Sequence, residues 1–251
     1  MKRVYAAVAC LLFAAFALAE ESGDAPPPQE PRSPEALAVL QQADEAIKAV
    51  HSVRCRVKAV PSGVAANFFP SAEGTSVLVG WSGSGPQKFY ADVQATGRDG
   101  QTRALTGGGD GNTFFLVDHT GKKGYEDMDP DVMGTSGRAV RGLGMQEYVH
   151  HAPFDDELNA ESIALEGEEA VEGEPCRKVH VKYGGGRGES VWYFSKNDHL
   201  PRRRVQLFNF QGQEGKFEVT LTKLETNVEP ESGLFRMRLP EGYERVEDFA
   251  P

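Results

Sequence analysis

The pattern of apolar and polar positions becomes regular at Ser33. From there, apolar residues recur every three or four positions, which is the spacing of one face of an α-helix: Ala36, Leu40, Ala43, Ile47 and Val50. Ser33 is a favourable N-cap residue, and Pro34 fits the first helical position. The sequence therefore predicts an amphipathic helix over residues 34–51, with its apolar face buried and with Gln41 and Lys48 exposed.

After residue 52 the period of the pattern changes from that of a helix to that of a strand. Apolar and polar residues alternate most clearly in four segments: 53–59, 77–81, 89–95 and 217–222. Turns rich in Gly or in Asn and Asp predict further strands at 101–106, 112–118, 162–171, 176–183, 189–195 and 202–210. One apolar and one polar face is typical of antiparallel sheets, and short connections favour pairing of consecutive strands in a meander.

One long segment, residues 136–158, shows no alternation and interrupts the strands. Its apolar residues suit one or two short helices, which Pro153 divides. The apolar face of a long twisted sheet must be covered, and the N-terminal helix and this insertion are the candidates for the cover. The predicted fold class is therefore mainly β with few helices (α+β). It is a curled antiparallel sheet, or half-barrel, with an N-terminal helix and a helical insertion covering its concave face.

The N-terminal end has the pattern of a cleavable signal peptide over residues 1–19. Two basic residues precede an uncharged apolar run at 4–18, and Ala17-Leu18-Ala19 offers small residues for cleavage. The run of about 15 residues is shorter than the roughly 20 needed to cross a bilayer, which disfavours an uncleaved anchor. The sequence therefore predicts export.

Residues 20–32 are rich in proline and acidic residues and predict a disordered leader, so residues 33–251 are expected to form a single exported domain. The formal net charge of the chain is −10. This charge disfavours binding to nucleic acid and to anionic lipid headgroups. After the predicted signal peptide, apolar runs are too short for stable membrane insertion.

Cys55 and Cys176 are the two cysteines that follow the predicted signal peptide. An oxidising compartment favours a disulfide between them. Alternation opposes it, because Cys55 shares its strand face with apolar neighbours whereas Cys176 shares its face with Lys178 and His180. The disulfide is therefore a possible one, and the cysteine spacing does not predict a structural zinc site.

The densest cluster of polar side chains lies at residues 150–157, where two histidines are followed by three acidic residues. Such ligands suit transition metals, but adjacent histidines point in different directions, and helical metal motifs place their ligands one turn apart. The acidic residues fit better as the first turn of a short helix. Residues 202–204 are a run of arginines, which a strand splits between two faces, and a solvated strand start is the simpler interpretation.

Sequence motifs of known catalytic sites are also missing. The Gly-rich segment 107–112 lacks the lysine and the following helix of a phosphate-binding loop, and no nucleophile elbow occurs. The sequence therefore predicts no catalytic residues, no metal site and no cofactor.

Three segments in the C-terminal third carry a resemblance to a known superfamily. The first is the turn and strand start Val171-Glu172-Gly173-Glu174-Pro175-Cys176. In the second, Val191-Trp192-Tyr193-Phe194 runs into Asn197-Asp198-His199-Leu200-Pro201-Arg202-Arg203. The third extends from Gly233-Leu234-Phe235 to Leu239-Pro240-Glu241-Gly242-Tyr243. With the order of the predicted elements, they resemble the lipoprotein-carrier superfamily of periplasmic LolA-like and LolB-like proteins, which includes the LolA-like domain of envelope-stress sensors.

These motifs, in residues 171–243, are signatures of a fold rather than of a catalytic site. The resemblance implies an exported, periplasmic, non-enzymatic binding protein with an apolar cavity for an acyl chain or a lipoprotein. A mobile helical insertion is expected to admit the ligand. The alternatives are a sensor or scaffold module that binds another envelope protein through the same fold, and, less favoured, a hydrolase.

Strand alternation supplies the candidate residues of this cavity: Val79, Trp81, Phe89, Val93, Phe115, Trp192, Phe194, Phe217, Val219 and Leu221. For any single one of them, filling an ordinary core is the simpler interpretation. Their convergence on one space is the stronger expectation, because the strands concerned are far apart in the sequence.

Overall fold

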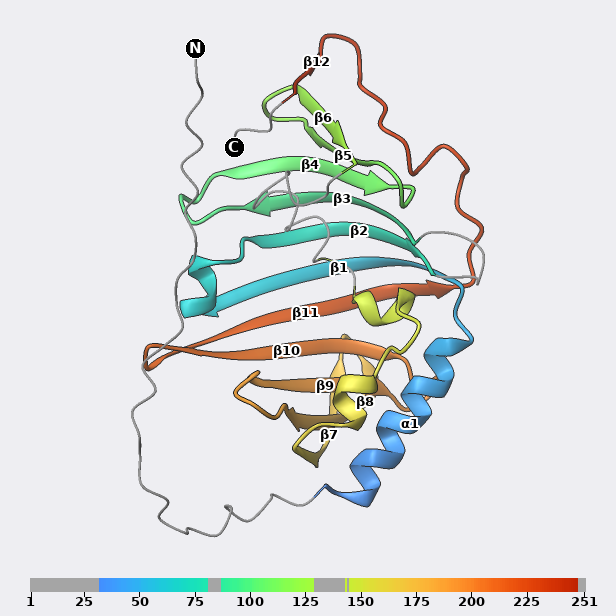
Figure 1. Ribbon diagram of the computed structural model, residues 1–251, viewed down its shortest axis with the longest axis vertical. Coiled ribbons are helices and arrows are strands. Elements are labelled where there is room, and N and C mark those ends of the chain that lie inside the picture. The colour runs from blue at the N-terminus through green and yellow to red at the C-terminus, as the bar shows by residue number, and fades with distance from the viewer. Residues whose placement is uncertain (1–31, 81–86, 129–142, 144, 248–251) are drawn as a thin grey trace, which may run out of the picture.

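The computed structural model describes residues 32–80, 87–128, 143 and 145–247 (Figure 1). The predicted signal peptide, the predicted leader up to residue 31, Trp81, and residues 136–142 and 144 of the predicted insertion lie outside these residues. The described strands form one open sheet of 12 strands in the spatial order β12, β6, β5, β4, β3, β2, β1, β11, β10, β9, β8 and β7. The protein is therefore mainly β, as the alternation predicts.

The strands are β1 (Ser52–Gly63), β2 (Ser71–Val79), β3 (Lys88–Thr96), β4 (Thr102–Gly109), β5 (Phe114–Asp118), β6 (Lys123–Asp127), β7 (Ser162–Val171), β8 (Glu174–Lys182), β9 (Glu189–Ser195), β10 (Pro201–Phe210), β11 (Gln213–Thr226) and β12 (Glu244–Arg245). The described helical segments are α1 (Pro34–Lys48), α3 (Asp155–Leu158) and the 3₁₀ turns η1 (Val64–Asn67) and η3 (Gln146–Val149). None of the described helices has the length and apolarity needed to cross a membrane.

Helix α1 begins where its capping residues predict and ends at Lys48 rather than near residue 51. The Ala36 N–H donates to Ser33 Oγ at 3.3 Å, and the Ala49 N–H closes the last turn by donating to the Ala46 carbonyl. One face is buried, as its period requires: Ala36, Val39, Leu40, Ala43 and Ile47. Gln41 and Lys48 are exposed on the other side.

Two antiparallel meanders make up most of the sheet. Strands β1–β6 and β7–β11 each pair in sequence order. The two meanders join where β11 pairs with β1, with Leu221 opposite Val57, and β12 adds to β6 in parallel. Local patterns do not predict these last two pairings, because each joins segments far apart in the sequence.

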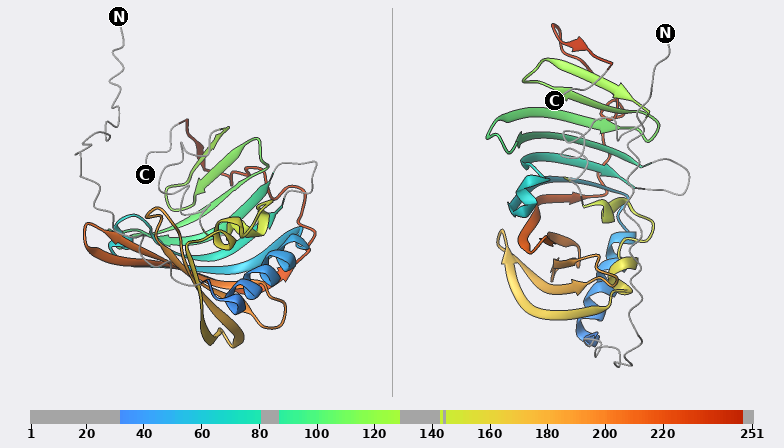
Figure 2. Two further views of the ribbon diagram at one scale, coloured as in Figure 1. Left: turned by 60° about the horizontal axis from the view of Figure 1, so that its bottom comes forward. Right: turned by 60° about the vertical axis from the view of Figure 1, so that its left-hand side comes forward.

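The sheet is curled, and α1, η3 and α3 lie on its inner, concave side (Figure 2). One hydrophobic cluster fills this side and includes Leu40 of α1, Val57 of β1, Leu105 of β4 and Val179 of β8. A second, smaller cluster lies on the opposite, convex side: Val171, Cys176, Val191, Tyr193 and Val205. The principal core therefore extends across both meanders.

Strand register shows which residues face the concave side, because directly paired residues lie on the same face. Leu78 of β2 pairs with Val53 of β1, so Leu78 faces the concave side and Val79 faces the convex side. On β5, Leu116 pairs with the concave-facing Gly107, so Phe115 is also convex. The prediction that Val79 and Phe115 point inward is wrong.

The physical reason is that both faces are covered in this half of the sheet. Phe115 is buried on the convex side, and the chain that follows β11 runs past the ends of the neighbouring strands to reach β12 (Figure 1). There Leu239 packs so closely over Gly124 that a Cβ on this glycine would clash, and Tyr243 Oη is 3.1 Å from His119 Nδ1. When both faces are buried, alternation no longer identifies the inner one.

Candidate functional site

The concave face changes in side-chain size along the sheet. Two rows of small side chains cross β2, β3 and β4: Ala91 lies between Ser76 and Gly107 in one row, and Ala95 pairs with Ala72 in the other. Larger side chains on the same face flank these rows, namely Leu78, Val93 and Leu105. These residues are buried. Small side chains let another group approach the backbone closely, so this part of the face is shaped to receive a covering apolar group.

The other half of the concave face is filled by aromatic rings. Trp192 and Phe194 of β9 lie parallel with centroids 5.9 Å apart. Phe154, immediately before α3, packs edge-on against Trp192 at 5.3 Å and Phe194 at 5.4 Å. All three side chains are fully buried. The chain therefore fills this half with its own residues, including one from the predicted insertion.

Most of the predicted cavity residues converge on one cluster. The buried members are Val93, Trp192, Phe194, Phe217, Val219 and Leu221, and Phe89 packs against them. Val79 and Phe115 are on the other face, and Trp81 lies outside the described residues. Three pockets among the described residues are lined by other side chains. Convergence is therefore observed, and a cavity at the predicted residues remains a proposal.

The two cysteines are free and buried in different clusters. Cys55 belongs to the concave core, whereas Cys176 belongs to the convex cluster. Burial raises the pKa of Cys55 to about 12 and that of Cys176 to about 11. The possible disulfide is not formed, because the sheet separates the two thiols.

A polar pocket of about 530 Å³ opens beside the described end of the insertion. Its lining comes from η3, α3, the residues between them, the connection between β8 and β9, and strand β10: Glu147, His150, His151, Ala152, Pro153, Asp155, Asp156, Glu157, Tyr183, Arg187, Arg204 and Gln206. The rings of His150 and His151 lie with centroids 4.5 Å apart at a tilt of 36°, which corrects the expectation that they point apart. Across the described residues, no group of three or more His, Cys, Asp or Glu side chains is arranged to hold a metal ion.

An ion pair fastens the insertion to β10 at the wall of this pocket. Arg204 Nη1 lies 2.7 Å from Glu147 Oε1, and the Arg204 guanidinium lies over the Trp192 ring at 5.2 Å. Glu147 Oε2 and Arg204 Nε are buried without a hydrogen-bond partner among the described residues. The pair therefore ties η3 to the sheet while two of its polar atoms stay unsatisfied.

A buried carboxyl makes the second attachment. The Tyr183 hydroxyl donates to Glu157 Oε1 at 2.6 Å. Burial raises the pKa of Glu157 above its ordinary value, and the hydrogen bond from Tyr183 opposes part of that rise. Desolvation and the neighbouring Glu157 also raise the pKa of Tyr183. This part of the pocket therefore favours a neutral carboxyl.

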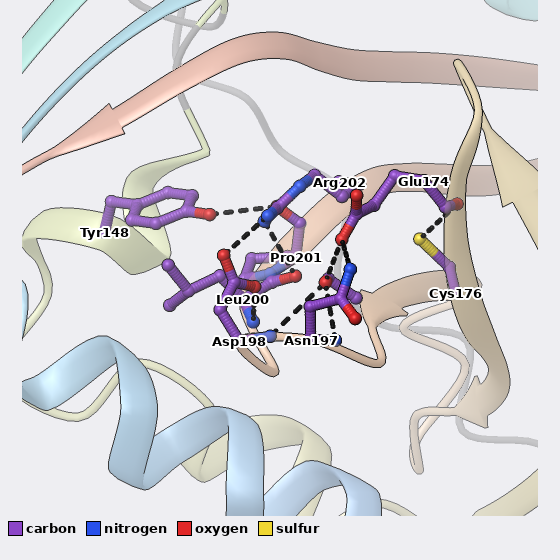
Figure 3. Close-up of polar contacts among 9 residues, drawn as sticks. Tyr148, Glu174, Cys176, Asn197, Asp198, Leu200, Pro201 and Arg202 are labelled. Carbon is purple, nitrogen blue, oxygen red and sulfur yellow. Dashed lines mark hydrogen bonds and ion pairs between the residues drawn. The ribbon is translucent and has the colours of Figure 1, made fainter.

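The turn between β9 and β10 makes the third attachment (Figure 3). Arg202 pairs with Asp198 at 2.6 Å, and Asn197 Nδ2 donates to Glu174 Oε1 at 2.9 Å. The buried Tyr148 hydroxyl donates to the Pro201 carbonyl at 2.9 Å. The motif that suggested a superfamily from sequence thus builds a hairpin and anchors η3, which is a structural role.

Several of these residues could not be assigned from sequence. The arginine run does split between faces, with Arg203 over Tyr193 on the convex side and Arg204 over Trp192 on the concave side. The expectation of a solvated strand start is wrong, because Arg203 and Arg204 are paired and largely buried. Strand alternation predicts that neighbouring arginines face opposite sides of the sheet. The ion-pair partners of Arg203 and Arg204 become visible only once the strands are paired in the structure.

Known proteins resemble this chain in fold rather than in sequence. No protein-family model matches the sequence, and no curated protein matches it either. LprF from Mycobacterium bovis is similar with a TM-score of 0.52 and 14% identity, over 84% of this chain and 99% of that chain. Lipoprotein LppX from Mycobacterium tuberculosis has a TM-score of 0.48 and 15% identity, over 78% and 98%. MucB has a TM-score of 0.49 and 16% identity, over 82% of this chain and 64% of its own.

At these identities the similarity to LprF shows the fold alone. The curled sheet with its helices on the concave side is a LolA-like fold, which is the fold that the resemblance in the sequence implies.

Proposed function

We propose that this protein is an exported, periplasmic, non-enzymatic binding protein that holds an acyl chain, free or on a lipoprotein, against the concave face of its sheet. The observation that carries the proposal is the difference in side-chain size along that face. Trp192 and Phe194 fill one half, whereas in the other half the row through Ala91 and Gly107 leaves the backbone closely approachable. Burying an acyl chain there contributes about 0.8 kcal/mol for each methylene.

In this proposal, residues 145–158 control access to the face. Met145 belongs to the concave core, and Glu147 and Tyr148 fasten the next turn to β10. Releasing these contacts frees residues 145–149 from β10 while Phe154 stays packed on Trp192 and Phe194 and the strand ladders stay intact. Ligand entry therefore requires a local opening of the insertion.

The composition of the polar pocket supports the non-enzymatic part of the proposal. The described lining combines His150 and His151 with carboxylates but contains no serine, threonine or cysteine to act as a nucleophile. A hydrolase of the kind that sequence alone leaves open would need such a group beside the histidines. The described lining therefore disfavours a Ser-His-carboxylate hydrolase at this pocket.

The test is to purify the natively exported protein without detergent and to identify extracted lipids by mass spectrometry. We expect a retained acyl lipid, and we expect fatty acids to displace a bound hydrophobic dye. Neither retained lipid nor displaceable dye would overturn the proposal. Retention of an envelope protein in place of lipid would also overturn the proposal, and it would favour the scaffold alternative.

A pair of variants on β3 tests the location of the ligand. Ala91→Leu fills the small-residue row on the concave face, whereas Gln94→Leu adds a similar side chain on the exposed side of the same strand. Overpacking typically costs 1–3 kcal/mol, so Ala91→Leu should weaken fatty-acid binding by about tenfold. Gln94→Leu should bind as the wild type does. Equal affinities for the two variants, both with wild-type circular dichroism, would place the ligand elsewhere.

A further inference from the structure

An aromatic path runs from the surface to the core at one end of β1, β10 and β11. The Phe68 and Phe210 side chains are 54% and 51% exposed, and their rings meet edge to face at 5.8 Å. Behind them, Phe69 lies 5.6 Å from Phe208 and stacks on Phe217 at 4.5 Å. Phe217 is buried in the concave core. We call Phe68, Phe69, Phe208 and Phe210 the aromatic rim.

Both segments that carry the aromatic rim are free of charge. Residues 59–72 and residues 205–213 contain no Asp, Glu, Lys or Arg, although these types make up 25% of the whole chain. Figure 1 shows η1 and the β10–β11 turn at the same end of the sheet. Two adjacent uncharged turns with exposed rings suit a surrounding medium that excludes charge.

The two exposed rings are held on rigid supports. Gln211 and Gly212 form a tight turn with φ of 53° and 77°, which fixes Phe210 at the end of its strand. The Phe68 and Phe69 N–H groups each lie 3.0 Å from the Ala65 carbonyl. A Cβ on Gly215 would come within 2.5 Å of Ala65 N, so this glycine lets η1 pack directly on β11. The rings are therefore presented outward by a fixed backbone.

We propose that the aromatic rim docks this protein on the surface of a lipid bilayer with neutral, zwitterionic headgroups. Two half-exposed phenylalanines offer roughly 200 Å², far below the roughly 800 Å² per partner of a stable protein interface. Insertion of rings into a bilayer needs no complementary surface. The net charge of −10 repels anionic headgroups, which selects a neutral membrane.

This docking deepens the proposed function and rests on it for its purpose. The rim continues through Phe69 and Phe217 into the concave face, so a chain leaving the bilayer at the rim meets apolar rings along its way to that face. The rim thus brings one end of the concave face to the bilayer surface, while the local opening of the insertion admits the acyl chain to that face. Docking by two rings is weak, which allows the protein to leave the membrane after exchange.

The experiment is flotation of the full chain with phosphatidylcholine vesicles. The wild type should float with the vesicles. The fraction of the Phe68→Ser, Phe210→Ser double variant that floats should be lower by about fivefold or more. Leu165→Ser, which removes a 39% exposed apolar side chain from edge strand β7, is the matched control and should bind as the wild type does. A Phe210→Trp variant should shift its emission to the blue when vesicles are added.

No vesicle binding by the wild type, or equal binding by the double variant, would overturn the proposal. Stronger binding to anionic vesicles that ignores the double substitution would do so as well, because charge rather than the rings would then hold the protein. Fatty-acid displacement without vesicles separates this inference from the proposed function. The double variant should keep that displacement and its melting temperature while losing flotation.

Discussion

Among single residues, Glu157 carries a built-in pH dependence. Its carboxyl is buried, and burial raises its pKa from the ordinary value of 4.5. A raised folded-state pKa means that the folded protein holds the proton more tightly than the unfolded chain does. The resulting stabilisation is complete below the unfolded pKa and is lost as pH rises through the folded one.

Glu157→Gln should remove this loss, because the amide stays neutral and its oxygen still accepts from the Tyr183 hydroxyl. The free energy of unfolding of the variant should exceed that of the wild type at neutral pH, and the difference should shrink toward pH 4. Urea denaturation across pH 4–8 measures this. Asp156→Asn, which removes an exposed carboxylate from the same turn, is the control. A pH profile of Glu157→Gln identical to the wild-type profile would contradict the prediction.

Single residues also show where alternation is a sufficient guide. On β11 it places Phe217, Val219 and Leu221 correctly, because the opposite face of that strand is polar and partly exposed. On β2 and β5 it fails for Val79 and Phe115, because burial on both sides removes the contrast. The opposite faces of Cys55 and Cys176 follow from the same parity, whereas the partner of Arg204 does not.

Among the elements, α1 was the most predictable, because its period, cap and first proline all agree. The short elements were not, because non-local packing defines them. Turn η1, for example, depends on Gly215 of β11 for its close approach. The polar pocket shares this property, since its walls come from η3, α3, the connection between β8 and β9, and strand β10.

Helix α1 should contribute substantially to stability through the face it buries. Leu40 is fully buried in the concave core, so Leu40→Ala leaves a cavity and should cost about 2–5 kcal/mol of unfolding free energy. Gln41→Ala changes the exposed neighbour and should stay within about 0.5 kcal/mol of the wild type. Chemical denaturation measures both. Similar values for the two variants would show that the helix is not packed on the sheet in solution.

For the molecule as a whole, the pairing of β11 with β1 has the largest effect on the architecture. It converts two meanders into one sheet and brings Leu105 of β4 and Val179 of β8 into one core. Sequence patterns predict each meander because their contacts are local. They do not predict the closing pair, whose members are separated by most of the chain.

A single core across both meanders predicts a single unfolding transition. Far-ultraviolet circular dichroism and the tryptophan fluorescence of the wild type should give coincident urea curves, because neither meander keeps a complete core without the other. Leu105→Ala in one meander and Val179→Ala in the other should each shift both curves together. If β1–β6 and β7–β11 were instead independent units, each substitution would move only one part of the transition. Separated curves would therefore contradict the single-domain organisation on which the proposed binding face depends.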